Sequence, residues 1–189
     1  WRPAKLQASW LGYPHSAGPR TIDHIMLDPH IRPDDPALLI ERPLQLARSW
    51  VVLGGLGFND RIAITPGLPS ARAGHVTFGT MNNPYKYTPD NLALWARITA
   101  SVAGSHFLFV RPEGATAAFR ANTRAIFAAN GVAAHHVEFE PVRGAHMPHY
   151  NRIDIALDTF PQTGGTTTCE TLWMGVPTVT LVGEAFYER

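Results

Sequence analysis

In the second half of the chain, short apolar runs alternate with longer stretches of helical periodicity. The short runs predict strands at residues 76–79, 106–110, 137–139, 153–158 and 177–181. Helical periodicity predicts helices from Pro89 to Gly104 with Thr88 as N-cap, at 115–129 with a stop at Asn130-Gly131, and from near Thr166. Strands that alternate with helices of these lengths indicate an α/β fold with a parallel, Rossmann-like sheet.

The first half of the chain is less regular. Strands are predicted at residues 6–12 and 22–27, whereas residues 28–70 contain many prolines and little periodicity except around Leu44 to Leu53. Such a composition is typical of a connector between two lobes. We therefore expect two domains, in which residues 1–72 form the end of a first lobe with its connector and residues 73–189 form a second, Rossmann-like lobe.

The junction after the predicted strand at 153–158 has the composition of a phosphate-binding turn. Gly164 and Gly165 allow the backbone to approach a ligand closely. Thr166–Thr168 are predicted to offer both an N-cap hydroxyl and free first-turn amides, which together suit a diphosphate. Glu170, about one turn further on, is within reach of a nucleotide's sugar hydroxyl. An ordinary capped helix after a turn is the alternative. The run has neither the lysine of a P-loop nor a GxGxxG fingerprint, so neither common phosphate-binding motif explains it.

The loops after the other predicted strands are candidates for the same site, because ligands of parallel sheets bind beyond the carboxyl ends of the strands. Residues 80–86 bring two amides and Lys86 to such an end, where a lysine can neutralise the charge of a departing diphosphate. Residues 141–150 include Arg143, which can contact phosphate or base edges, and His146, which can stack on a planar base. A solvated lysine and surface histidines are the alternatives.

A further loop, residues 11–14, follows a strand in the amino-terminal part of the chain. Its Gly and Pro flank a Tyr in a tight turn whose backbone groups can bind sugar hydroxyls, although simple loop chemistry explains it equally well. His15 beside this turn is weak evidence for a general base.

Composition narrows the classes of partner. The apolar fraction of 45% is enough for a packed core, and the net charge of +1 is spread without a basic stripe for nucleic acid or an anionic membrane. The sequence contains neither an apolar run of membrane-spanning length nor an amino-terminal signal peptide. One cysteine excludes an internal disulfide framework and fits a reducing compartment. We expect a cytoplasmic protein with no nucleic-acid or membrane partner.

Thiol and metal chemistry are weakly indicated. Cys169 lies in the first turn of the predicted helix, which would tend to lower its pKa, but no base stands beside it, and we interpret it as a buried helix residue. A zinc site is an alternative that the spacing does not favour, and it would use four histidines: His135, His136, His146 and His149. We expect no metal.

Four blocks of the sequence carry a family resemblance. They are Leu11–Pro14, Phe78–Pro89, Tyr150–Asp158 and Gly164–Pro177. In this order they resemble the catalytic region of the O-linked N-acetylglucosamine transferase family. Members of this family are inverting GT-B glycosyltransferases that use UDP-sugars, and they often carry tetratricopeptide repeats upstream. The resemblance implies a GT-B fold and transfer of a sugar, N-acetylglucosamine, from a UDP-sugar donor to Ser or Thr of a protein or peptide acceptor. It implies no cofactor, because the UDP-sugar is a substrate.

The resemblance also implies roles for matching positions. Lys86 corresponds to the lysine that contacts the UDP diphosphate and supports departure of the leaving group, and Asn83 stands in the place of a glutamine near the nucleotide. Arg143 lies where a lysine is close to the uridine, and His146 where a histidine stacks on uracil.

Further matches lie in the glycine turn and in the first loop. Thr166 and Thr167 match the hydroxyl pair at the diphosphate, and Glu170 takes the place of the acidic residue that binds ribose. Gly165 occupies a position that is histidine in animal members, which leaves the preference for the donor sugar open. The loop beside the donor sugar is matched by Leu11, Gly12, Tyr13 and Pro14.

We expect the chain to be a fragment of a bacterial-type member. It begins without methionine and stops just after a strand-like segment, and Pro84 and Pro148 depart from the animal pattern. The family's amino-terminal lobe carries further catalytic histidines ahead of this sequence, so no general base is identified and the fragment alone is expected to be inactive. The alternatives are an N-glucosyltransferase relative that uses UDP-glucose on Asn, and a non-catalytic nucleotide-binding scaffold.

Overall fold

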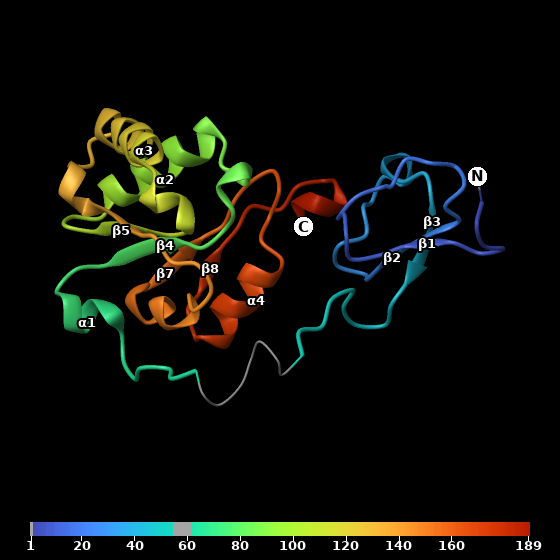
Figure 1. Ribbon diagram of the computed structural model, residues 1–189, viewed down its shortest axis with the longest axis horizontal. Helices are drawn as coiled ribbons and strands as arrows, with labels where there is room; N and C mark the ends of the chain where they lie inside the picture. The colour runs from blue at the N-terminus through green and yellow to red at the C-terminus, as the bar shows by residue number, and fades with distance from the viewer. Residues whose placement is uncertain (1, 55–61) are drawn as a thin grey trace. The chain divides into compact units, whose positions relative to one another are not determined.

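The computed structural model describes residues 2–54 and 62–189 (Figure 1). Their contacts divide the chain into unit 1 (Trp1–Gly54, Pro161–Thr163 and Leu181–Arg189) and unit 2 (Gly55–Phe160 and Gly164–Thr180). This division by contacts differs from the predicted boundary between residues 72 and 73, which concerned the lobes of a longer protein and stays a prediction. The part of the predicted connector at 55–61 lies outside the described residues.

Unit 2 is built on a five-stranded sheet. Its strands are β4 (Thr77–Thr80), β5 (His106–Val110), β6 (Val137–Glu140), β7 (Ile155–Leu157) and β8 (Thr178–Val179). Their order is β6-β5-β4-β7-β8, and each neighbouring pair is parallel. The predicted parallel, Rossmann-like sheet is therefore confirmed, with strands that differ from the predicted ranges by a few residues at their ends.

Helices flank this sheet. They are α1 (Pro69–Ala73), α2 (Pro89–Ser101), α3 (Ala117–Ala129) and α4 (Thr166–Trp173), and Figure 1 shows α2 and α3 together on one side of the sheet with α4 on the other. The predicted N-cap of α2 is confirmed, because Thr88 Oγ1 accepts a hydrogen bond from the backbone N–H of Asn91 at 3.1 Å. Helix α3 begins later than predicted because Pro112–Ala115 form a separate 3₁₀ turn.

Short 3₁₀ helices occupy several loops. They are η1 (Pro36–Leu38), η2 (Pro84–Lys86), η3 (Pro112–Ala115), η4 (Ala134–His136), η5 (Met147–Arg152) and η6 (Phe186–Glu188). Three of them, η1, η2 and η3, begin with proline, whose fixed φ angle suits the first position of a helical turn.

Strand β5 contributes to two cores, one on each face of the sheet. Phe107 and Phe109 pack with Trp95 and other aromatic side chains in the first core, and Leu108 and Val110 point into the second. Successive side chains of a strand alternate between faces, so a strand that is buried on both faces is apolar throughout. This is why the sequence predicted β5 with its bounds unchanged.

Unit 1 contains a second, smaller parallel sheet. Its strands are β1 (Ala8–Ser9), β2 (His24–Leu27) and β3 (Arg42–Gln45), in the order β1-β2-β3. The strand predicted at 6–12 is confirmed only in two central residues, and the strand predicted at 22–27 is confirmed over its last four residues. Sequence reasoning missed β3, because its four residues are exposed and include Pro43, so they carry no hydrophobic pattern.

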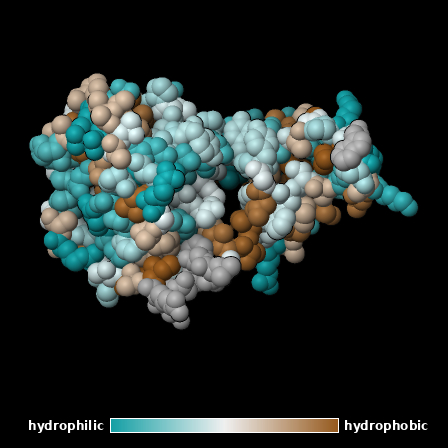
Figure 2. Space-filling view, viewed as in Figure 1, coloured by the Kyte–Doolittle hydropathy of each residue, from teal (hydrophilic) through white to brown (hydrophobic). Residues whose placement is uncertain are grey.

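On the face shown in Figure 2, unit 2 is mostly hydrophilic with scattered apolar residues, whereas apolar residues are more frequent over unit 1. Among the helices of the described ranges, none has the length and apolar character needed to cross a membrane.

The fold makes Gly79, in strand β4, sensitive to substitution. An added Cβ would lie 2.7 Å from Ile153 Cδ1 and 3.0 Å from the carbonyl oxygen of Leu108, inside the packed sheet. We expect Gly79→Ala to lower the free energy of unfolding by about 1–3 kcal/mol, measured by urea denaturation. Gly54→Ala is the control, because an added Cβ there meets no atom within 4 Å. Equal effects of the two substitutions would contradict the packing argument.

Candidate functional site

The sheet of unit 2 has a switch point between β4 and β7. The chain runs outward from β4 through β5 to β6, and then returns to place β7 and β8 on the other side of β4. The loops that leave the carboxyl ends of β4 and β7 therefore diverge, and α/β proteins bind ligands in the crevice that such a divergence creates. The candidate site lies at this edge.

A cavity of about 380 Å³ opens there, and loops after four parallel strands line it. Its lining residues are Met81, Val110, Arg111, Pro112, Val142, Arg143, Gly144, His146, Thr166, Thr167 and Glu170. The structure thus brings together five residues that the sequence nominated for one site: Arg143, His146, Thr166, Thr167 and Glu170. The volume is in the range of pockets that hold small ligands.

The amino-terminal end of α4 borders this cavity. Its N-cap is Gly165, with φ −107° and ψ −88°, and no side-chain hydrogen bond caps it among the described residues. The predicted capping by a threonine hydroxyl is wrong, because the helix already includes Thr166, and Thr168 Oγ1 donates back to the carbonyl oxygen of Gly164 at 3.0 Å. First-turn amides without such a cap can bind an anion.

Asp158 holds the glycine turn in position. It follows β7, and its Oδ1 accepts hydrogen bonds from the backbone N–H groups of Thr159 and Gly164, each at 2.8 Å. Asn82 Nδ2, from the loop after β4, donates to the same oxygen at 2.9 Å. Thr180 Oγ1 donates to Oδ2 at 2.9 Å. One carboxylate therefore joins the loops on both sides of the switch point.

Only glycine fits at position 164 in this arrangement. An added Cβ would lie 2.6 Å from Thr168 Oγ1 and 3.0 Å from Asp158 Oδ1. Gly165 differs, because a Cβ there would meet no atom within 4 Å. Position 165 could therefore carry a side chain, whereas position 164 could not.

Lys86 lies on η2, in the loop after β4. Asn83 is the N-cap of this turn, and its side-chain oxygen accepts a hydrogen bond from the backbone N–H of Tyr85 at 3.3 Å. Burial lowers the pKa of the Lys86 ammonium, and the charge of Asp158 opposes that shift. Since Asp158 also binds the glycine turn, Lys86 lies on the same edge of the sheet as that turn. Neither Lys86 nor Asn83 is among the residues that line the cavity.

Glu170 accepts two side-chain hydrogen bonds in the cavity. Its Oε2 is 3.0 Å from His146 Nε2 and 3.1 Å from the Tyr150 hydroxyl, which donates to it. His146 Nδ1 lies 2.6 Å from the carbonyl oxygen of Gly144, so both ring nitrogens face acceptors. The hydrogen bond to Glu170, more than any other contact, raises the pKa of His146. Burial and the charge of Glu170 raise the pKa of Tyr150.

Sequence reasoning missed Asp158 and Tyr150 as parts of the site. A polar residue at the end of an apolar strand, as at Asp158, is too common to indicate a role by itself. Tyr150 is 20 positions from Glu170 in the sequence, and no local pattern reports their contact.

The residues predicted to bind the donor sugar, Leu11–Pro14, lie in unit 1. Leu11 has a positive φ of 59°, and the backbone N–H of Gly12 donates to the carbonyl oxygen of Trp10 at 2.8 Å. A tight turn is therefore present, but it is centred on Leu11 and not on Tyr13 as predicted. A cavity of about 250 Å³ in this unit is lined by Tyr13, Pro14, His15, Pro161, Gln162 and Tyr187. Sugar binding by Leu11–Pro14 stays a prediction.

The structure also tests the interpretation of Cys169 and the alternative of a zinc site. Cys169 is half-buried, and burial raises the pKa of its thiol, which supports the interpretation as a packed helix residue. The zinc alternative with four histidines is wrong. Within the described ranges, the only group of three or more possible metal ligands is His75, His106 and Glu138.

Comparisons with known proteins agree with this geometry. The family described as Glycosyl transferase family 41 matches residues 65–189. The proteins named "Probable UDP-N-acetylglucosamine--peptide N-acetylglucosaminyltransferase SPINDLY" of Eustoma exaltatum subsp. russellianum and Oryza sativa subsp. japonica are each 34% identical over 96% of this chain and 20% of their own length. The chain thus spans about a fifth of the length of these relatives.

Two further likenesses extend over the whole chain. The protein named "Probable UDP-N-acetylglucosamine--peptide N-acetylglucosaminyltransferase SEC" of Arabidopsis thaliana is 26% identical over 100% of this chain and 20% of its own length. A solved structure of a mutant O-GlcNAc transferase from Thermobaculum terrenum has a TM-score of 0.83 and 30% identity, and the match covers 100% of this chain and 35% of that one.

The raised pKa of His146 predicts a pH dependence of stability. The His146–Glu170 pair should stabilise the fold fully below the ordinary histidine pKa of 6.5, and this contribution should be lost as the pH rises through the higher pKa of the folded state. The measurement is the free energy of unfolding in urea, compared between wild type and His146→Gln from about pH 5.5 to about pH 8.5. Glu170→Gln should remove the same pH-dependent component. A difference from wild type that does not change with pH would contradict the pairing.

Proposed function

Because the chain belongs to glycosyl transferase family 41, we propose that it is part of a protein O-glycosyltransferase whose unit 2 holds the nucleotide of a UDP-sugar. The family and the GT-B type of fold, both predicted from the sequence, are confirmed by the family match and by the likeness to the solved O-GlcNAc transferase. The names of the relatives give UDP-N-acetylglucosamine as their donor and a peptide as their acceptor. We assign the same donor to this chain, with Ser or Thr of a protein as the acceptor.

The observation that carries the proposal is the uncapped start of α4 beside a polar cavity at the switch point. A diphosphate placed against Thr166 and Thr167 would meet backbone donors and the positive end of the helix dipole. Exposed Arg143 lines the same cavity, and Lys86 lies on the same edge. These groups supply the positive charge that a nucleoside diphosphate needs.

Glu170 is suited to bind the ribose of that nucleotide. Its Oε2 accepts from His146 and Tyr150, whereas its Oε1 accepts none of the hydrogen bonds found among the described residues. That second oxygen is therefore available to a hydroxyl of the ligand. The pairing with His146 also differs from the stacking on uracil that the resemblance implied, so either the ring moves on binding or it contacts the base while bonded to Glu170.

The proposed reaction is a direct displacement at the anomeric carbon. The acceptor hydroxyl oxygen forms a bond to this carbon while the bond to the diphosphate oxygen breaks, and the electron pair of that bond leaves with UDP. The hydroxyl proton passes to a base that these residues do not identify. Lys86 and the start of α4 stabilise the charge that grows on the diphosphate, which is catalysis by positioned electrostatic groups.

Nucleotide binding tests the proposal directly. Isothermal titration with UDP should give a saturable heat with the wild-type chain, and Glu170→Ala should weaken binding about tenfold or more, because the ribose loses a charged acceptor. Glu184→Ala, which removes a carboxylate from unit 1, should leave the affinity unchanged. Absence of a saturable heat with wild type would contradict the proposed nucleotide site. Donor hydrolysis by the full-length enzyme with UDP-N-acetylglucosamine and UDP-glucose distinguishes the two donor sugars.

The role of Lys86 predicts a split between turnover and affinity. In the full-length enzyme, Lys86→Ala should lower kcat about 100-fold or more while changing UDP affinity only a few-fold, because the ammonium acts mainly on the charge of the leaving group. Lys5, the other lysine of the sequence, provides the matched control, and Lys5→Ala should change neither quantity. Equal losses of kcat and affinity would assign Lys86 to binding alone.

A further inference from the structure

A group of imidazoles lies at the amino-terminal edge of the unit 2 sheet, opposite the edge of the candidate site. His75 precedes β4, His106 begins β5, and His136 immediately precedes β6. Because the three strands are parallel and adjacent, their first residues lie next to one another. The rings of His75 and His106 stack with centroids 3.7 Å apart, and those of His106 and His136 with centroids 4.5 Å apart.

Glu138 brings a carboxylate to this group. Its Oε1 lies 2.7 Å from His106 Nδ1. Each of His75, His106 and Glu138 offers one possible ligand atom, and these three atoms lie within 4.8 Å of one another. Two imidazoles and a carboxylate form a donor set that suits borderline divalent ions, and Zn²⁺ above all in three-ligand sites that keep an open position. We propose that His75, His106 and Glu138 bind a Zn²⁺-like divalent transition-metal ion.

The distances require only a small adjustment. Donors placed tetrahedrally about 2.1 Å from a zinc ion are about 3.4 Å apart. The His106–Glu138 contact is shorter than this value, and the widest separation in the group is 4.8 Å or less. The ion would replace the hydrogen bond between His106 and Glu138, and His75, which is half-buried, would complete the set by turning its ring out of the stack.

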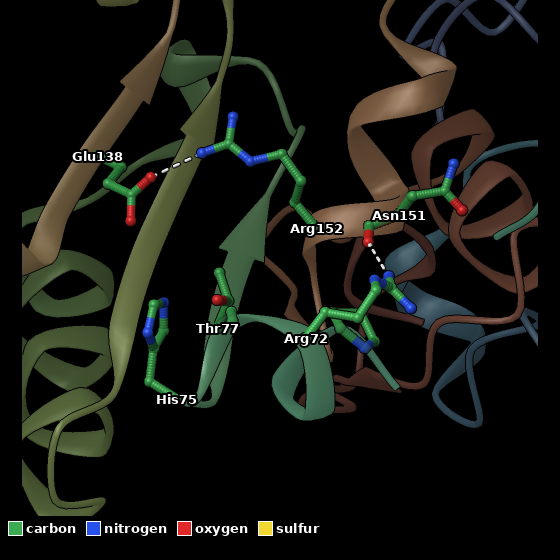
Figure 3. A pocket seen from close by; sticks show the side chains of 8 residues that line it. Arg72, His75, Thr77, Glu138, Asn151 and Arg152 are labelled. Carbon is green, nitrogen blue, oxygen red and sulfur yellow. Dashed lines mark hydrogen bonds and ion pairs between the residues drawn. The ribbon is translucent and has the colours of Figure 1, made fainter. Parts of the chain in front are cut away.

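The charges around the group leave one carboxylate oxygen for the ion. Arg152 donates to Glu138 Oε2 at 2.7 Å and to Glu140 Oε2 at 2.9 Å, so two carboxylates offset its charge. Figure 3 shows Arg152 reaching across to Glu138 in this way. A partner on the second oxygen is a common way to orient a metal-binding carboxylate. Oε1, on the His106 side, remains the donor atom.

A cavity gives the ion access and room for a further ligand. Its volume is about 320 Å³, and His75, Thr77 and Glu138 are among the residues that line it. Arg72 also lines this cavity, but its guanidinium donates to backbone carbonyl oxygens, including that of Asn151 at 3.0 Å (Figure 3). Water in the cavity could occupy the fourth coordination position.

The inference is independent of the proposed function. The metal ligands lie at the start of the parallel strands, whereas the candidate nucleotide site lies at their carboxyl ends. An ion bound there would connect β4, β5 and β6 and would stabilise the folded chain by mass action. It also departs from our expectation from the sequence that the chain binds no metal.

The test is a titration of the metal-free wild-type chain with Co²⁺ followed by visible absorption, and with Zn²⁺ followed by calorimetry. We expect one equivalent of Co²⁺ to give the bands of a four- or five-coordinate ion, and Zn²⁺ to displace it and raise Tm. His75→Ala and Glu138→Gln should each weaken binding about tenfold or more. His149→Asn, a histidine of the same unit outside the ligand group, should bind as wild type does.

Two results would overturn the proposal. One is the absence of saturable Co²⁺ or Zn²⁺ binding by the wild-type chain, and the other is binding that His75→Ala leaves unchanged. Circular dichroism establishes that each variant is folded. If Glu138→Gln does not fold, the comparison of His75→Ala with His149→Asn decides the outcome. UDP affinity measured on the same variants should not change, so failure here is distinguishable from failure of the proposed function.

Discussion

The hydrogen bonds of the Asp158 carboxylate are the interaction on which the candidate site depends. They join the loop after β4, through Asn82, to the glycine turn after β7, through the N–H of Gly164. Because the glycine turn leads directly into α4, this connection helps to set the direction in which the helix presents its first amides. The missing side chain of Gly164 is part of the same arrangement, since a Cβ there would collide with the Thr168 hydroxyl and press against the Asp158 carboxylate. In the proposed function, recognition of a diphosphate would thus rely on a residue that does not touch it.

The hydrogen bonds around Glu170 also hold the candidate site in a fixed arrangement. His146 and Tyr150 both bond to one of its oxygens and leave the other directed to no protein group among the described residues. A ligand hydroxyl that bonds to Glu170 would therefore enter an arrangement that is already oriented, which reduces the entropy lost on binding. Because the charge of His146 depends on Glu170, any ligand that competes for this carboxylate also changes the protonation of the imidazole.

The sequence predicts those parts of the molecule that carry a one-dimensional pattern. Strand β5 is buried on both faces and is apolar at every position after His106, and α2 begins at a Thr-Pro pair that fixes its first turn. Strand β3 is exposed and contains Pro43, so only its neighbour in the sheet reveals it. The residues of the candidate site likewise include some that a local pattern predicts and some that only tertiary structure brings together. Gly164 and the threonines after it are a local signal, whereas the bond between His146 and Glu170 joins residues 24 positions apart and follows from tertiary structure.

Unit 1 is discontinuous along the chain, because its contacts unite the first 54 residues with two short segments that follow much later. During synthesis, the strands β1, β2 and β3 leave the ribosome long before Pro161–Thr163 and Leu181–Arg189 exist. Unit 2 is interrupted only by Pro161–Thr163, and its last strand, β8, directly precedes the final segment of unit 1. Unit 1 therefore cannot complete its contacts during synthesis until Leu181–Arg189 has been made, so its amino-terminal strands must stay without part of their packing while the whole of unit 2 is synthesised.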